Sequence, residues 1–483
     1  MRLNSRRSLA VLGIAMLGAL GFATAAAALP PAIARAFLDE GIPLTAVAVY
    51  VREIGSARPL LAHHATRPMN PASTMKLVTT FAGLELLGPG YRWKTEAYAD
   101  GPIDGNTLDG NLVLKGYGDP KITIEQFQAL ITALRATGLT TIRGDLVLDR
   151  SYFALPPHDP AAFDAEPLKP YNVGPDALLV NFKSVRFLFT PNAAGDAVDI
   201  SIDPPLANIT LHGALQPTTG ECTDWRSALG AAFVNRADSA VASFAGRYPA
   251  ACGERDWYVA LLDHPHYVLA MFARYWKDAG GSFAGGVRDG RPPPAGKPIA
   301  TLQSPPLYDT VRDINKLSNN VMARQLFLTL ATTAYPPPAT TQHAAEAVRR
   351  WLLQQKLRFP ELVMDNGSGL SRRERIAAQS MAQLLLAADA SKLRSDFVSS
   401  LAVAATDGTV RKRFTDDAVA DWALLKTGSL EGVRALAGYV YGVDGRRYVL
   451  VCLVNHPNAA RAQPALDMLV ERIYAGTLDG GSR

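Results

Sequence analysis

The sequence predicts an α/β protein of the α+β type, in which an antiparallel sheet is flanked by helices. Three observations predict it: two strand patterns near the N-terminus, a helical middle section, and a C-terminal strand pair followed by an amphipathic helix. The chain has 483 residues, 48% hydrophobic and 19% charged, with only 3 cysteines. This composition excludes a disordered chain and a small disulfide-stabilised protein, and the length suggests about three domains.

Residues 1–28 predict a secretory signal peptide that is cleaved after export to the periplasm. Arg2, Arg6 and Arg7 precede an apolar run over 9–22 and a tract of small residues. A membrane anchor is the alternative, and the arginine pair leaves the twin-arginine route open beside the general secretory one. Without this segment 46 Lys and Arg face 44 Asp and Glu, so the net charge falls from +5 to +2. Nucleic-acid binding then lacks electrostatic support, and no later segment predicts a stable membrane span.

Helix and strand patterns alternate along the rest of the chain. The first half predicts a helix at 33–38, strands at 44–52 and 59–63, a helix at 72–87, short strands within 96–153 around a helix at 123–137, a long loop at 154–175, and strands at 185–190, 197–202 and 209–211. The second half predicts a helical segment between Cys222 and Cys252, helices at 267–279, 307–332 and 343–355, strands at 422–427, 435–441 and 448–455, and a helix at 463–474. An Asp444-Gly445 turn is expected to join the last two strands.

The three cysteines differ in their surroundings. Cys222 and Cys252 lie 30 residues apart and could pair in an oxidising compartment, although three free buried thiols remain the alternative. Cys452 lies in an apolar strand pattern and is expected to be an unpaired core residue.

The segment Ser73-Thr74-Met75-Lys76 is the first candidate for catalytic chemistry. At the start of a predicted helix, this spacing places the hydroxyl and the amine on one face. A serine needs a base to act as a nucleophile, and a lysine can be that base when burial or neighbouring charges lower its pKa. For this motif alone, a capping serine beside an exposed lysine is the alternative.

Two further motifs supply polar groups for the same chemistry. Ser318-Asn319-Asn320 places a hydroxyl and an amide on a turn flanked by helices, where they can relay a proton to a leaving amine and hold a substrate amide. Lys426-Thr427-Gly428 ends a predicted strand, where the lysine and the hydroxyl can bind a carboxylate and the glycine lets a substrate lie along the strand edge. The backbone N–H groups of Ser73 and Ser429 are expected to form an oxyanion hole.

These three motifs, in this chain order, are typical of serine β-lactamases and penicillin-binding proteins. The sequence resembles the class C low-molecular-mass penicillin-binding proteins, the D-alanyl-D-alanine carboxypeptidase/endopeptidase family. The separation of 242 residues between Lys76 and Ser318 (318 minus 76) favours this family, because its relatives keep the two motifs much closer. Further family-like segments lie at 116–120, 144–149, 304–307 and 365–372, with Tyr117 where the family often has glycine.

The resemblance implies a serine β-lactamase/transpeptidase-like catalytic domain that is split by an inserted domain, with a third domain nested inside the insertion. The expected boundaries are 29–95 and 292–483 for the catalytic domain, 96–185 and 258–291 for the inserted domain, and 186–257 for the nested domain. The Pro/Gly-rich stretch at 290–296 is expected to mark the return to the catalytic domain.

The resemblance also implies hydrolysis of peptidoglycan stem peptides and cross-links, with no cofactor. Ser73 attacks the carbonyl carbon between two D-alanines, Lys76 accepts its proton, and water hydrolyses the acyl-enzyme. The other expected roles are protonation of the departing amine (Ser318, Lys426), orientation of the substrate amide (Asn320) and binding of the terminal carboxylate (Lys426, Thr427, Gly428). β-Lactam antibiotics are expected to acylate Ser73 as covalent inhibitors.

By the same resemblance, four residues are expected to contact the peptidoglycan peptide: Arg372, Asp149, Leu430 and Glu431. A surface ion pair or loop packing is the alternative for each of them. The sequence leaves the balance between carboxypeptidase and endopeptidase action open, because both cleave the bond on the carboxyl side of a D-alanine.

Two other functions are alternatives to this one. A β-lactamase-like hydrolase shares the acylation step, but the long insertion argues against it. A non-catalytic peptidoglycan-binding scaffold would not need all five catalytic candidates. The pairs His63-His64 and His264/His266 invite a metal site, but no third ligand stands at metalloenzyme spacing, so none is expected.

Overall fold

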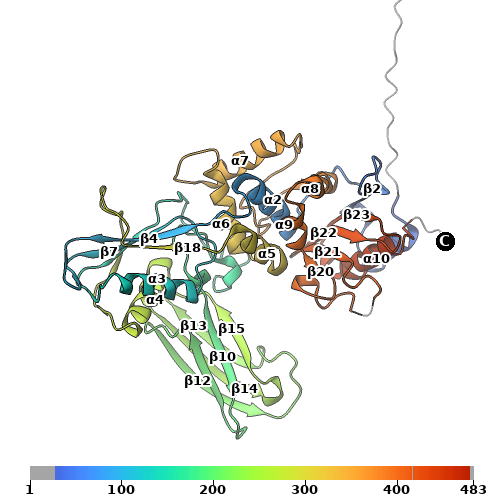
Figure 1. Cartoon of the computed structure of the whole chain (residues 1–483). Helices are drawn as coiled ribbons and strands as arrows, with labels where there is room; N and C mark the ends of the chain where they lie inside the picture. The colour runs from blue at the N-terminus through green and yellow to red at the C-terminus, as the bar shows by residue number, and fades with distance from the viewer. Residues whose placement is uncertain (1–27, 416, 479–483) are drawn as a thin grey trace, which may run out of the picture.

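In the computed structural model, which describes residues 28–415 and 417–478, a layer of helices lies between a six-stranded sheet and an elongated lobe of smaller sheets (Figure 1). Apart from residue 28, the predicted signal peptide lies outside the described residues. Within these described ranges, no helix is long and apolar enough to cross a membrane.

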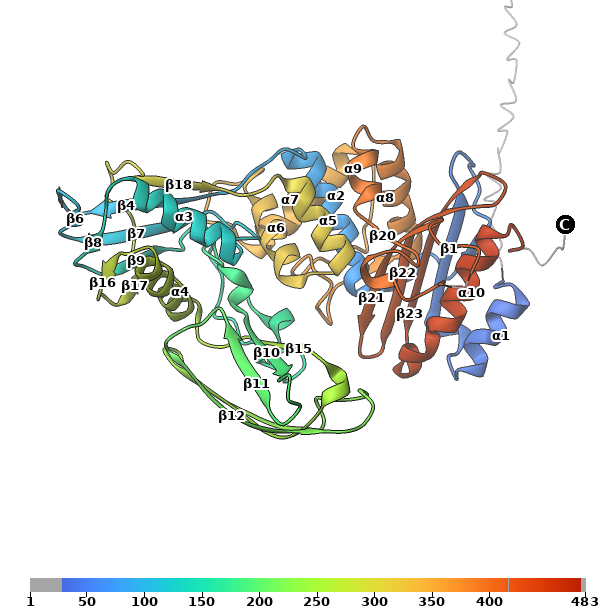
Figure 2. The ribbon, with the colours of Figure 1, turned by 60° about the horizontal axis from the view of Figure 1, so that its bottom comes forward.

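The six-stranded sheet is antiparallel throughout and brings the two ends of the chain together. Its strand order is β2 (Leu61–His63), β1 (Val47–Glu53), β23 (Arg447–Asn455), β22 (Val433–Tyr441), β21 (Ala423–Leu430) and β20 (Ala402–Val403). Helices α1 (Pro31–Asp39) and α10 (Gln463–Tyr474) cover one face, and α8 (Ala378–Ala390) covers the other (Figure 2). Alternate residues of β23 therefore face different helices, since side chains of a strand alternate between faces. The predicted antiparallel sheet flanked by helices is confirmed.

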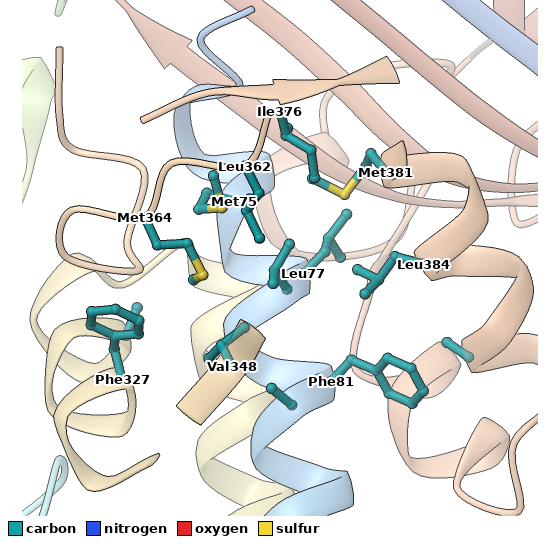
Figure 3. Close-up of a cluster of buried hydrophobic side chains, with 14 of the residues drawn as sticks. Met75, Leu77, Phe81, Phe327, Val348, Leu362, Met364, Ile376, Met381 and Leu384 are labelled. Atoms are coloured by element: carbon teal, nitrogen blue, oxygen red, sulfur yellow. The ribbon is translucent and has the colours of Figure 1, made fainter. Parts of the chain in front are cut away.

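A helical layer packs beside this sheet around α2, which is buried on almost every side. Its members are α2 (Lys76–Leu87), α5 (Leu307–Leu317), α6 (Asn320–Ala331), α7 (Thr341–Gln354) and α9 (Arg394–Ser399). Leu77 and Phe81 of α2 share one hydrophobic cluster with Phe327, Val348 and Leu384 from three other helices (Figure 3). A short antiparallel pair, β3 (Pro68–Met69) with β19 (Ile376–Ala377), lies beside the same cluster.

Between α2 and α5 the chain forms the elongated lobe, which contains a mixed five-stranded sheet. Its strand order is β17 (Val287–Asp289), β9 (Leu146–Asp149), β7 (Asn111–Gly116), β4 (Lys94–Asp100) and β18 (Ala300–Gln303). Helices α3 (Ile124–Ala136) and α4 (His264–Asp278) share its core. A separate, smaller sheet of the lobe has the strand order β16 (Ser282–Phe283), β8 (Thr141–Ile142), β6 (Thr107–Leu108) and β5 (Ile103–Asp104).

The position of β18 bears on the expected domain boundary at 292. This strand pairs with β4, so a segment assigned to the catalytic domain hydrogen-bonds within a sheet of the lobe. The chain crosses between the two parts near Trp93 and Ser304, where the Trp93 N–H donates to Ser304 Oγ over 2.9 Å. The domain division stays a prediction, and this pairing favours a boundary after β18.

The helical segment expected between Cys222 and Cys252 is wrong, because this segment forms strands. Two three-stranded sheets complete the lobe. The first has the strand order β11 (Val198–Asp203), β10 (Val185–Pro191) and β15 (Arg255–Val259). The second has the order β12 (Ile209–Thr218), β14 (Ala240–Pro249) and β13 (Leu229–Asn235). Alanines suggest a helix, but in β14 Ala240, Ala242 and Phe244 are buried and alternate with less buried residues, as in a strand. The Cys222–Cys252 disulfide is present, and Cys452 is free and buried, as expected.

Several other elements agree with the sequence prediction, and some boundaries differ. The helix at 123–137, the closing helix and the C-terminal hairpin are present. The helical pattern over 307–332 forms two helices, with the expected turn between them: α5 ends at Leu317 and α6 begins at Asn320. The helix expected from 72 begins as a 3-10 turn, Ala72–Met75, and the strand expected from 44 begins as another, Leu44–Ala46.

Candidate active site

Ser73 lies in the 3-10 turn that leads directly into α2, and Lys76 is the first residue of that helix. Lys76 is fully buried, and its Nζ lies 2.9 Å from Ser73 Oγ. Nζ also contacts Asn320 Oδ1 at 2.6 Å and the backbone carbonyl oxygen of Ser368. A neutral lysine has two N–H groups and one lone pair. Asn320 and Ser368 can accept both N–H groups, which leaves the lone pair for the Ser73 hydroxyl proton.

Burial changes the charge state of the two lysines in the site. It lowers the pKa of Lys76 well below its ordinary value, and the charges of Lys426 and Arg324 lower it further, against an opposing effect of Glu374. Burial also lowers the pKa of Lys426 to about 7. The site can therefore hold a neutral base beside a second lysine that is still partly charged near neutral pH.

The second motif forms the break between α5 and α6. Ser318 has a left-handed backbone (φ +58°) that ends α5, and the side chain of Asn319 caps α6 by accepting the Met322 N–H over 3.0 Å. This turn directs Ser318 Oγ to Lys426 Nζ at 2.8 Å, while Asn320 contacts Lys76. The three predicted motifs are thus joined by hydrogen bonds at a single site.

The third motif lies on β21 next to the turn that carries Ser73. A Cβ added at Gly428 would lie 2.7 Å from the carbonyl oxygen of Pro71, so the close approach of β21 requires glycine. β20 pairs only with Leu424 and Leu425. Among the described strands, none pairs with β21 from Lys426 onward on the side away from β22, so this edge can receive an extended peptide. The oxyanion hole expected from the N–H groups of Ser73 and Ser429 stays a prediction.

The loop at 365–370 contributes a residue whose role the sequence did not predict. Ser368 supplies the carbonyl oxygen that accepts from Lys76, and Gly369 (φ +82°) packs against the Ser73 turn. The fully buried Glu374 holds this loop, because its Oε1 accepts the N–H groups of Asp365, Asn366 and Gly367 at 2.9 to 3.2 Å. The glycines on both sides of Ser368 were the available sequence signal.

The predicted substrate-contact residues separate into two places. Arg372 donates to the backbone carbonyl of Glu431 over 2.8 Å, just beyond Leu430, and its guanidinium lies 4.8 Å from the ring centre of Phe163. Asp149 is only 1% exposed and lies in β9, where it pairs with Lys115 at 3.3 Å. No described hydrogen bond or ion pair joins it to the catalytic motifs, so its contact with substrate stays a prediction.

Candidate metal ligands do not cluster in this site. Across residues 28–415 and 417–478, no group of three or more His, Cys, Asp or Glu side chains could hold a metal ion. His63 and His64 instead contact the backbone carbonyls of Leu44 and Val47, and His266 pairs with Asp263 at 2.8 Å.

Comparisons with known proteins point to one family. The D-Ala-D-Ala carboxypeptidase 3 (S13) family matches residues 29–473. A D-alanyl-D-alanine carboxypeptidase DacB from Haemophilus influenzae is 27% identical over 392 residues, covering 80% of each chain. A D-alanyl-D-alanine carboxypeptidase from Actinomadura sp. (strain R39) is 26% identical over 457 residues, covering 89% of this chain and 81% of the relative.

Solved structures show the same fold. Penicillin binding protein 4 (dacB) from Haemophilus influenzae matches with a TM-score of 0.73 at 25% identity, covering 91% of this chain and 99% of that one. The same protein in complex with a β-lactam matches with a TM-score of 0.70 at 24% identity and the same coverage.

Proposed function

The chain belongs to the D-Ala-D-Ala carboxypeptidase 3 (S13) family, among the class C low-molecular-mass penicillin-binding proteins, and on this premise we propose how it acts on peptidoglycan. It is a serine D-alanyl-D-alanine carboxypeptidase that hydrolyses stem peptides through an acyl-enzyme on Ser73. The observation that carries this proposal is the buried Nζ of Lys76, in contact with Ser73 Oγ, Asn320 Oδ1 and the Ser368 carbonyl. An exposed lysine at the same spacing would stay protonated and could not act as a base.

Acylation begins when Ser73 Oγ attacks the carbonyl carbon of the penultimate D-alanine and Lys76 takes the hydroxyl proton. The N–H groups of Ser73 and Ser429 stabilise the oxyanion of the tetrahedral intermediate. As the C–N bond breaks, the departing amine receives a proton through Ser318, whose hydroxyl lies 2.8 Å from Lys426 Nζ. Water then hydrolyses the ester, which returns Ser73 to its starting state.

The edge of β21 positions the substrate for this attack. An extended peptide adds to this edge as a strand and places its terminal carboxylate near Lys426 and Thr427. The Thr427 hydroxyl lies 2.8 Å from that of Thr409, so a carboxylate there would meet two hydroxyl groups and an amine. Asn320 orients the substrate amide, and Arg372 with Glu431 contacts the part of the peptide that precedes the cleaved bond.

β-Lactams react with the same serine and block it. The relative from Haemophilus influenzae has been solved in complex with a β-lactam, and the contact between Lys76 Nζ and Ser73 Oγ here supports covalent binding at Ser73. The predicted signal segment, the disulfide and the family's cell-wall substrate support export to the periplasm.

The direct test is release of D-alanine from a muropeptide that ends in D-Ala-D-Ala. The wild-type protein is expected to release one D-alanine per peptide, and Ser73→Ala is expected to release none while its thermal unfolding is unchanged. Rapid hydrolysis of nitrocefin without D-alanine release would support a β-lactamase instead. Intact muropeptide with both proteins would support a scaffold.

A further inference from the structure

Arg434 is an arginine beside the catalytic strand whose charge has no acidic partner. It lies in β22 directly opposite Ser429 of β21. Among the described residues it forms no ion pair, whereas the nearby Arg413 pairs with Asp467. Burial and the charge of Arg413 lower the pKa of Arg434, and no described carboxylate raises it, but an arginine stays charged at neutral pH. Arg434 therefore holds a positive charge that is available to a ligand.

The guanidinium of Arg434 keeps accessible N–H groups at its outer end. The side chain is partly exposed, and its Nη1 donates to the hydroxyl of Ser429. Nε is buried without a described partner, whereas Nη2 makes no described hydrogen bond and is not closed off from solvent. A guanidinium binds a carboxylate best through two neighbouring N–H groups, one from each of two nitrogens. Nη1 and Nη2 can therefore present such a pair to one carboxylate beside Ser429.

Two hydroxyl groups of the third motif lie on the same face of the sheet as Arg434. Ser429 stands opposite Arg434, and Thr427, two residues earlier on β21, points to the same side of the strand. Two residues along a strand span about 7 Å, so one carboxylate with hydrogen bonds of about 2.8 Å fits between the two hydroxyls. The guanidinium thus lies beside the hydroxyls at which the proposed function places the end of the substrate.

We propose that Arg434 binds the terminal carboxylate of the substrate, between the hydroxyls of Thr427 and Ser429, and so makes the protein specific for peptides with a free C-terminus. The inference rests on the proposed function, which places this carboxylate near Lys426 and Thr427. Lys426 alone is a weak anchor at neutral pH, because its pKa is about 7 and it also contacts Ser318. Arg434 supplies a positive charge that does not change over this pH range. Lys426 serves both the departing amine and the carboxylate, whereas Arg434 serves the carboxylate.

The test compares a pentapeptide that ends in D-Ala-D-Ala with the same peptide amidated at its C-terminus. Arg434→Ala is expected to lower kcat/KM for the acid about tenfold, as for one lost charge-assisted hydrogen bond, and to leave the amide unchanged. Arg434→Lys keeps a charge without the paired N–H groups and is expected to lie between the wild type and the alanine variant. Arg446→Ala, on the exposed turn between β22 and β23, removes the same charge elsewhere on the sheet and is expected to change neither substrate.

The outcomes separate this inference from the proposed function. An equal loss for both substrates in Arg434→Ala, or no loss for the acid, overturns the carboxylate site and leaves the carboxypeptidase standing. Wild-type protein that releases no D-alanine contradicts the proposed function itself. Calorimetry with the inactive Ser73→Ala variant then decides the site without turnover. Weaker binding of the acid, but not of the amide, when Arg434→Ala is added supports the site. Equal or undetectable binding of the acid with and without Arg434 overturns it.

Discussion

At the level of residues, the chemistry of the site depends on two fully buried lysines, Lys76 and Lys426. The sequence places Lys76 three residues after Ser73, but an exposed lysine at that position would be protonated at neutral pH. In the fully buried site Lys76 contacts Asn320 and Ser368, which lie 244 and 292 residues further along the chain. The motif could therefore be predicted from spacing, whereas the lowered pKa depends on tertiary contacts that the sequence alone does not show.

The pKa values of the two lysines predict a bell-shaped pH dependence. Acylation slows at acidic pH, because Lys76 takes up a proton and can no longer accept one from Ser73. Substrate binding weakens above about pH 7, because Lys426, with a pKa of about 7, loses the charge that attracts the terminal carboxylate. Measuring kcat and KM for D-alanine release across pH checks both limbs. A rate that rises steadily toward the pKa of an ordinary lysine, about 10, contradicts the proposed base.

Glu374 is expected to position the loop that holds Lys76. Glu374→Ala removes the acceptor of three backbone N–H groups in a buried site and is expected to lower the free energy of unfolding by about 2 to 4 kcal/mol. Penicillin acylation is expected to slow as well, because the Ser368 carbonyl shifts away from Lys76. Urea unfolding and labelling kinetics measure the two effects.

The matched control for that experiment is Glu374→Gln. The glutamine keeps an amide oxygen for the same N–H groups, so it is expected to retain more stability and more acylation than the alanine variant. Equal acylation rates in wild type and Glu374→Ala would show that the loop does not depend on this side chain.

At the level of elements, the site depends on close packing between helices, the strand β21 and the loop at 365–370. The break at Ser318 interrupts a pattern that is helical over 307–332, and the left-handed φ of this residue arises where α5 and α6 must separate. Serine and asparagine are common at helix ends, so a turn at 318–320 could be predicted although the helical spacing continues across it. In β13 and β14, strand pairing and burial outweighed the helix preference of alanine.

Gly369 tests this packing directly. An added Cβ would lie 2.7 Å from Ser73 Cα and would overlap the Ala72 carbonyl oxygen, in a backbone with φ +82°. Gly369→Ala is therefore expected to displace the Ser73 turn and to lower penicillin acylation at least tenfold, a loss of about 1.4 kcal/mol or more in activation free energy. Labelling with a fluorescent penicillin measures the effect.

Gly55→Ala provides the control for backbone strain. Gly55 also has a positive φ, +96°, but an added Cβ meets nothing within 4 Å. The Gly55→Ala variant is expected to lose some stability and to keep its acylation rate. Equal acylation rates in the two variants would show that the close approach of Gly369 to Ser73 does not matter.

At the level of the whole molecule, the six-stranded sheet is assembled from the two ends of the chain. β1 and β23 are adjacent in the sheet, and the lobe projects from between α2 and α5. The long gap between the first two motifs predicted an insertion, but the parallel pairing of β9 with β7 and β17 could not be predicted, because these strands are short and distant in sequence. Register over such distances is set by tertiary packing.

The disulfide is expected to stabilise the lobe without affecting catalysis. Cys222 and Cys252 lie 30 residues apart, so replacing both by serine is expected to destabilise their sheets by about 3 kcal/mol. Penicillin acylation is expected to continue, because Ser73 lies in the other part of the molecule. Limited proteolysis of the lobe and labelling kinetics test the two statements. Loss of acylation in a variant whose six-stranded sheet and helical layer still resist protease would show that the lobe is coupled to the site.

Every step of the proposed reaction depends on an acyl-enzyme at Ser73. The most direct measurement is mass spectrometry of the protein after incubation with a penicillin, followed by mapping of the modified peptide. One penicillin per chain on Ser73, and none on the folded Ser73→Ala variant, is the predicted result. An adduct on another residue, such as Ser368, or an unmodified wild-type protein would contradict it.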